Sequence, residues 1–105
     1  MPDIAIEIDK DKLRDFCRRW KVTEFALFGS VVRPEEFRED SDVDVLVRFA
    51  ADARWGLFEF LHAQDELAQI FGRDVDLVER QLVEQSENRF RKRSILRSVV
   101  LLDVA

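Results

Sequence analysis

The sequence of 105 residues is poor in side chains that build cross-links and metal cages, with one cysteine, one histidine and no tyrosine. A single cysteine cannot form a disulfide within the chain, which is typical of proteins of a reducing cytoplasm. The scarcity of cysteine and histidine excludes a zinc site built from several such ligands. Nothing beside His62 supports a triad with a serine or cysteine nucleophile. The chemistry of this chain must therefore depend on other residue types.

Glycine and proline are also scarce, with three and two residues, so long flexible linkers are not expected. No apolar run approaches the roughly 20 residues that a membrane-spanning helix needs. The first ten residues contain Asp3, Glu7 and Asp9, and such an acidic segment is not expected to be a signal peptide. We therefore expect a single domain over residues 1–105, without a membrane segment, in the cytoplasm.

The composition is that of a globular protein, because 47% of the residues are hydrophobic and 37% are charged. The formal net charge is -5, so the chain as a whole has no basic field and direct nucleic-acid binding is not expected. One segment departs from this balance: residues 89–97, RFRKRSILR, contain five basic side chains. They are either a solvated helix face or a docking surface for an acidic partner or for RNA bound to that partner.

Apolar periodicity predicts a layered domain of strands and helices. Strands are expected at 23–28, 43–49 and 74–79, with a candidate fourth at 99–102. Helices are expected from the N-cap Asp9 to Trp20, from Gly56 to Phe71, and from Leu82 to about Arg97. Residues 4–8 fit either a short strand or an extended lead-in. The order predicts an α/β (α+β) fold, in which a mixed β-sheet of about four strands is flanked by helices.

Two pairs of aspartates open predicted strands, Asp42 with Asp44 and Asp74 with Asp76. Side chains alternate along a strand, so the two acids of each pair project from the same face. Neighbouring carboxylates repel each other unless a cation lies between them. Magnesium prefers such oxygen ligands and completes its coordination with water and phosphate oxygens. Each pair is also compatible with solvated acids at a strand end, with Arg73 as a counter-ion for the second pair.

The dipeptide Gly29-Ser30 follows the first predicted strand. Glycine permits a tight backbone and the close approach of a phosphate. Backbone amides after such a turn can point toward an anion. Taken alone, this dipeptide is an ordinary turn, so its meaning depends on the acids that follow it.

The order of these elements is more specific than any one of them. A strand, a Gly-Ser turn, a loop, Ser-Asp-x-Asp on a strand, a helix and an Asp on a further strand follow one another. The stretch FALFGSVVR…SDVDVLVRF, followed by GRDVDLV, resembles the DNA polymerase β-like nucleotidyltransferase superfamily. Within it, residues 25–78 resemble the minimal nucleotidyltransferase (MNT) family of prokaryotic toxin–antitoxin pairs. The resemblance implies a polymerase β-like nucleotidyltransferase core in a prokaryotic cytoplasmic protein.

The resemblance also implies which residues bind the nucleotide. Gly29 and Ser30 would bind the triphosphate of ATP. Arg33 would either steady the phosphates or pair with an acid of the following loop. Two departures from the family affect this loop: Pro34 stands where the family often has glycine, and the stretch from Ser30 to Asp42 is one residue longer than is common. Such loops tolerate changes of length, so metal binding is expected to be unaffected while the role of Arg33 is less defined.

Three acids would ligate two magnesium ions by the same resemblance: Asp42, Asp44 and Asp76. The family's third aspartate is followed by Leu-Val, which matches Asp76, so Asp74 ranks behind it. Two-metal catalysis uses a pair of ions to activate the attacking oxygen and to neutralise the leaving group. The same three aspartates are therefore the predicted catalytic residues.

The MNT family pairs with helical HEPN-type toxins, usually ribonucleases. The resemblance implies an antitoxin that forms a hetero-oligomer with such a toxin and transfers AMP from ATP to its tyrosine hydroxyl. Because this chain has no tyrosine, a tyrosine acceptor must come from a partner. Two alternatives stay open: an antitoxin that neutralises its toxin by binding alone, and a nucleotidyltransferase that acts on a small molecule or a nucleic acid.

Overall fold

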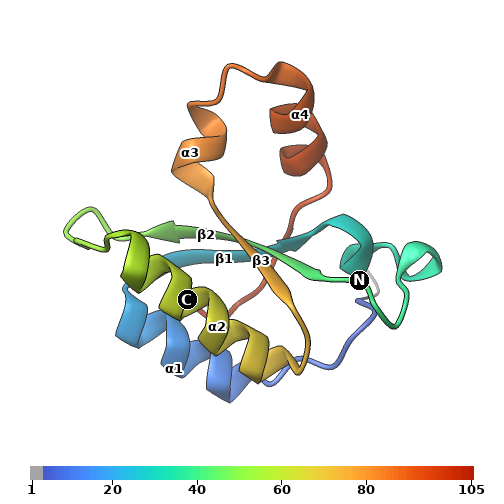
Figure 1. Ribbon diagram of the computed structural model, residues 1–105, viewed down its shortest axis with the longest axis horizontal. Helices are drawn as coiled ribbons and strands as arrows, with labels where there is room; N and C mark the ends of the chain where they lie inside the picture. The colour runs from blue at the N-terminus through green and yellow to red at the C-terminus, as the bar shows by residue number, and fades with distance from the viewer. Residues whose placement is uncertain (1–3) are drawn as a thin grey trace.

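The computed structural model describes residues 4–105, with all of their side chains except those of Arg91 and Ser94. Figure 1 shows a sheet with helices on both of its faces. Four strands form the sheet: β1 (Val22–Phe28), β2 (Val43–Phe49), β3 (Val75–Glu79) and β4 (Val100–Leu101). Four α-helices accompany them: α1 (Lys10–Trp20), α2 (Leu57–Phe71), α3 (Arg80–Glu84) and α4 (Arg89–Arg97).

The sheet is mixed, with the strand order β3-β2-β1-β4. Strand β1 runs antiparallel to both β2 and β4, whereas β2 and β3 are parallel. The parallel pair is joined by α2, the crossover helix that such a connection needs. This architecture confirms the predicted mixed sheet of four strands flanked by helices. Among residues 4–105, no helix is long and apolar enough to cross a membrane.

One face of the sheet packs against α1 and α2 and forms the larger core. Every second residue of β2 contributes to it, as strand alternation requires: Val43, Val45 and Val47 are buried there. Helix α1 begins as predicted, because the Asp9 carboxylate accepts a hydrogen bond from the Lys12 amide at 3.2 Å. Helix α2 ends at Gly72, whose φ of 71° is the left-handed conformation of a helix C-terminus.

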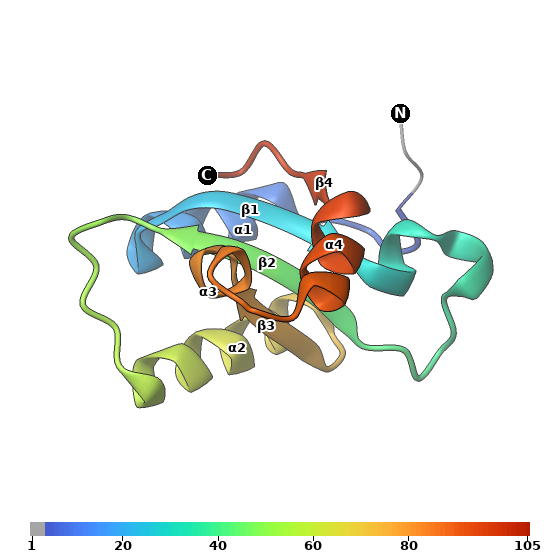
Figure 2. The ribbon, with the colours of Figure 1, turned by 90° about the horizontal axis from the view of Figure 1, so that it is seen from above.

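The opposite face packs against α3 and α4 through a smaller core (Figures 1 and 2). Its buried residues are Ala26, Phe28, Leu46, Val83 and Ile95. Because this cluster fills only the middle of the face, the two ends of the face are available for polar groups.

Two sequence predictions need correction. The helix expected over 82–97 is two helices, α3 and α4. They are separated where the Ser86 hydroxyl accepts a hydrogen bond from the Asn88 amide at 3.2 Å, a local bond that competes with the helical pattern. For residues 4–8 the sequence left a strand or an extended lead-in open, and the structure shows the extended lead-in, in which the Ala5 amide donates to the Val31 carbonyl at 2.9 Å. The segment expected as a loop over 35–42 also includes part of a short 3-10 turn, Pro34–Glu36.

Candidate active site

Two of the predicted acids lie in one row across the sheet. Asp44 of β2 pairs with Phe28 of β1 on one side and with Asp76 of β3 on the other. The neighbours of Asp44 in the chain, Val43 and Val45, are buried toward α1 and α2. Strand alternation therefore directs Asp44 and Asp76 to the opposite face, the one that carries α3 and α4.

Asp44 is the most buried of the three predicted acids, whereas Asp42 and Asp76 are exposed. Burial raises the pKa of Asp44 to about 6, and the negative charges of Asp76 and Asp42 add to the shift. The positive charge of Arg33 acts on this pKa in the opposite direction. The fold thus brings Asp42, Asp76 and Arg33 within electrostatic reach of Asp44, although they come from distant parts of the chain.

The glycine of the Gly-Ser turn lies directly against this site. Gly29 has a φ of 76°, in the left-handed region that favours glycine. A Cβ at this position would lie 2.1 Å from Oδ2 of Asp44, so a side chain and the carboxylate could not occupy the site together. Ser30 follows within a four-residue 3-10 turn, Gly29–Val32. Glycine is required here by the close approach of the backbone to the central acid.

Arg33 follows that turn, and its amide donates to the Ser30 carbonyl at 2.9 Å. Its guanidinium forms an ion pair with Glu36. Of the two roles considered from the sequence, the structure therefore shows the pairing with an acid of the loop. The charge of Arg33 still acts on Asp44, so a role toward phosphates stays a prediction.

Arg73 has a role that the sequence did not indicate. Instead of forming an ion pair with Asp74 or Asp76, its guanidinium donates to the Ser41 carbonyl at 3.2 Å. The same group lies over the ring of Phe37, 4.5 Å from its centroid. These contacts hold the loop immediately before Asp42. No sequence motif marks this role, because it depends on contacts between residues more than 30 positions apart.

The donor set suits a hard cation. Within residues 4–105, no three histidine, cysteine, aspartate or glutamate side chains are gathered in a ready-made metal cage. The three acids instead form an open, acidic site on the sheet. Magnesium usually binds through one or two carboxylates together with phosphate oxygens and water, so the carboxylates of this site fit it by chemistry.

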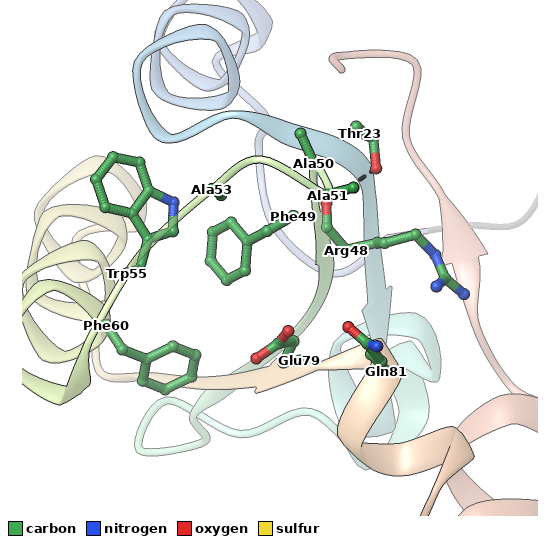
Figure 3. A pocket seen from close by; sticks show the side chains of 10 residues that line it. All are labelled: Thr23, Arg48, Phe49, Ala50, Ala51, Ala53, Trp55, Phe60, Glu79 and Gln81. Carbon is green, nitrogen blue, oxygen red and sulfur yellow. Dashed lines mark hydrogen bonds between the residues drawn. The ribbon is translucent and has the colours of Figure 1, made fainter.

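Two hollows include a predicted site residue in their walls. One, of about 350 Å³, has Asp76 in its wall and is otherwise mostly apolar; its other lining residues are Phe60, Leu77, Val78, Glu79, Leu82, Val83, Ser86, Lys92 and Ile95. The other, of about 430 Å³, is lined by Arg33, Phe90, Arg93, Arg97 and Ser98. A further hollow of about 500 Å³ lies where β2 ends at Arg48 and Phe49 (Figure 3), and it contains none of the six predicted site residues.

An acidic site on a sheet, with a glycine turn against its central carboxylate, is compatible with the class of enzymes that transfer phosphorus-containing groups with the help of a divalent cation. The comparison with known families identifies the class more closely. Residues 10–102 match the nucleotidyltransferase domain, and the chain belongs to this family. It is a nucleotidyltransferase, as its motifs predicted.

Two relatives carry a more specific name. The chain is 35% identical over 77 residues to a Methanocaldococcus jannaschii protein assigned as a protein adenylyltransferase, with 73% of each chain covered. It is 42% identical over 69 residues to the protein adenylyltransferase MntA of Thermococcus cleftensis. That match covers 66% of this chain and 64% of MntA.

Solved structures agree on the fold. A structure described as a minimal nucleotidyltransferase matches with a TM-score of 0.67 and 29% identity, over 89% of this chain and 88% of the other. A chain in the structure of a tri-AMPylated Shewanella oneidensis HEPN toxin in complex with an MNT antitoxin matches with a TM-score of 0.57. Its identity is 22%, over 88% of this chain and 66% of the other, so it supports the fold alone.

Proposed function

We propose that this chain is a magnesium-dependent protein adenylyltransferase that acts as an antitoxin. In this proposal it transfers AMP from ATP to a tyrosine hydroxyl of a HEPN-type ribonuclease toxin and so inactivates it. The observation that carries the proposal is the row in which Asp44 and Asp76 lie side by side, with the Gly29 backbone against Asp44. This row gives a cation and a phosphate neighbouring positions on one sheet.

The roles of the site residues follow from their positions. Asp42, Asp44 and Asp76 would hold the magnesium ions, and Asp76 would also face the acceptor. When bound, these ions supply charge neutralisation of the triphosphate and lower the pKa of the attacking hydroxyl. The backbone at Gly29 and Ser30 would hold the phosphates, with Arg33 beside them.

The transfer itself requires one bond to form and one to break. The acceptor oxygen bonds to the α-phosphorus of ATP, and the bond between the α-phosphorus and the bridging oxygen to the β-phosphate breaks. Pyrophosphate leaves, and the hydroxyl proton passes to Asp76. We place the acceptor in the apolar hollow that has Asp76 in its wall, because an aromatic ring suits that lining while its hydroxyl meets the acid.

The toxin as partner is supported by the resemblance of the motifs and by the name MntA. A tyrosine acceptor must come from another chain, since this one has no tyrosine. We place the reaction in the prokaryotic cytoplasm, where ATP and magnesium are available and the buried Cys17 stays reduced. That residues 1–105 act as one domain also stays a prediction.

The decisive test is intact-mass spectrometry of the HEPN-type toxin after incubation with this chain, ATP and magnesium. We expect the toxin to gain one or more AMP units. The Asp42→Asn/Asp44→Asn variant, in which the acids lose their charge but keep their shape, should give no gain. If neither version changes the mass and both still bind the toxin, this chain is an antitoxin that acts by binding alone. AMP on a small molecule or nucleic acid, with none on the toxin, would establish the other alternative.

A further inference from the structure

The hollow of about 430 Å³ beside the turn Gly29–Val32 has an unusual wall: three of its five lining residues are arginines. Arg93 and Arg97 come from α4, and Arg33 comes from the end of the turn. Figure 2 shows α4 beside this turn, at the end of β1. The positive charges of three arginines are therefore concentrated in one hollow.

Arg93 and Arg97 lack the partners that most other arginines have. Arg48 and Arg80, for example, form ion pairs with Glu24 and Glu84. Among the side chains that the structure describes, Arg93 and Arg97 have no hydrogen bond or ion pair. They are also four residues apart on one helix, a spacing at which like charges destabilise the helix. An anion in the hollow would compensate for this repulsion.

Arg33 connects the hollow with the acidic site. Arg33 lines the hollow and also acts electrostatically on Asp44. An anion that extends from the acids past the Gly-Ser turn would therefore reach Arg93 and Arg97. A guanidinium binds phosphate oxygens through two parallel hydrogen bonds, which suits a terminal phosphate.

From this arrangement we infer that Arg93 and Arg97, together with Arg33, form a subsite for the β- and γ-phosphates of the donor nucleotide. This inference rests on the proposed function, because it requires the nucleotide to lie across Asp44 and Gly29. It assigns a part of the basic segment 89–97, whose meaning the sequence left open. It also predicts that these arginines hold pyrophosphate as it leaves.

The test compares nucleotides with and without the outer phosphates. Isothermal titration calorimetry would measure the binding of a non-hydrolysable α,β-methylene ATP analogue with magnesium, and of AMP, to the intact chain. We expect Arg93→Gln and Arg97→Gln each to weaken binding of the analogue by about tenfold or more, the range for a charged hydrogen bond. Binding of AMP should not change, because AMP lacks the outer phosphates.

Arg89→Gln is the matched control. Arg89 lies one turn before Arg93 on α4, is exposed and does not line the hollow, so its loss changes the net charge equally without touching the subsite. Circular dichroism would verify that all three variants keep the fold, which is expected because all three side chains are exposed.

Three results would overturn the inference. The first is analogue binding that is unchanged in Arg93→Gln and Arg97→Gln, and loss of toxin binding in the same variants would then show a docking surface for an acidic protein. The second is an equal loss in Arg89→Gln, which would show a general effect of charge. The third is a wild-type chain that binds no analogue, which also contradicts the proposed function. Binding that depends on the two arginines without any AMP transfer would overturn the proposed function alone.

Discussion

The sheet face that α3 and α4 cover carries acids at both ends, in opposite electrostatic settings. At one end, Asp44 and Asp76 lie side by side with Asp42 near them, and their mutual repulsion contributes to the raised pKa of Asp44. At the other end, Glu24 and Glu84 lie beside arginines. On this face one row of side chains separates the two ends, and it contains the apolar Ala26 and Leu46.

At the end with Glu24 and Glu84, which we call the paired end, each acid forms ion pairs with arginines. Arg48 contacts Glu24 at 3.4 Å and Glu84 at 2.7 Å, and Arg80 contacts Glu24 at 3.2 Å. The hydrogen bond from Arg48 lowers the pKa of Glu84. Arginines were thus available to this face, yet the acids of the other end have none in hydrogen-bonded contact within the described side chains. We infer that the unpaired acids are kept for binding a cation.

The largest effect is expected when two single variants, each of which neutralises one acid at one of the two ends, are compared for AMP transfer. Asp76→Asn should lower AMP transfer on the order of 100- to 1,000-fold, because it removes the proposed metal ligand and proton acceptor. Glu84→Gln should leave transfer close to the wild-type rate, since an exposed ion pair contributes little. Single-turnover transfer at saturating ATP measures both.

Asp74→Asn is a closer control for the same experiment. Asp74 lies two residues from Asp76 and is exposed, and its carbonyl, which the substitution keeps, accepts from the Val43 amide at 2.9 Å. We expect transfer by this variant to be nearly unchanged. A loss as large as that of Asp76→Asn would contradict the choice of Asp76 as the third acid.

A smaller effect is expected from two glycines that share a backbone conformation. Gly29 and Gly72 have φ values of 76° and 71°, so alanine at either position should cost about 1–2 kcal/mol of unfolding free energy. A Cβ at Gly72 meets nothing within 4 Å, whereas one at Gly29 meets the Asp44 carboxylate. Gly29→Ala should therefore cost more than Gly72→Ala in urea unfolding, and only Gly29→Ala should lower transfer, by less than Asp76→Asn does. Equal losses of transfer would show that the effect comes from backbone strain common to both variants and not from the contact with Asp44.

Much of the candidate active site could be predicted from the sequence, because its residues belong to local sequence patterns. The alternation of β2 predicted that Asp42 and Asp44 share a face, and the Leu-Val after Asp76 matched the family motif. Glycine before Ser30 predicted a tight turn. The sequence could not predict that the Gly29 backbone lies against Asp44, since that contact depends on the pairing of β1 with β2.

The predictions that were wrong or missing depend on contacts between distant residues or on weak local bonds. The break between α3 and α4 contains a side-chain hydrogen bond at Ser86, a local bond of the kind that competes with the helical pattern. Arg73 holds the loop before Asp42 through a carbonyl 32 positions away. The paired end is likewise a product of topology, since its ion pairs join β1, β2 and α3.

The smallest expected effect distinguishes the two ends by pH, in the absence of magnesium. The pKa of Asp44 is about 6 in the folded chain, above the roughly 3.9 of an unfolded aspartate. The folded state therefore retains a proton that the unfolded state has lost, and the unfolding free energy falls as pH rises from about 4 to 6. For Glu84 the lowered pKa has the opposite sign: its contribution is present at neutral pH and is lost on acidification.

Urea unfolding in EDTA at pH 7.5 and pH 4 measures this difference. Asp44→Asn should raise the unfolding free energy by on the order of 1–2 kcal/mol at pH 7.5, after allowance for solvent screening, and by little at pH 4. Glu84→Gln should lower stability at pH 7.5 and have a smaller effect at the lower pH. Destabilisation by Asp44→Asn at both pH values would mean that this acid is held by favourable contacts, like those of the paired end. A gain confined to neutral pH would instead show that the fold tolerates a repulsive acid at the position where the cation is proposed to bind.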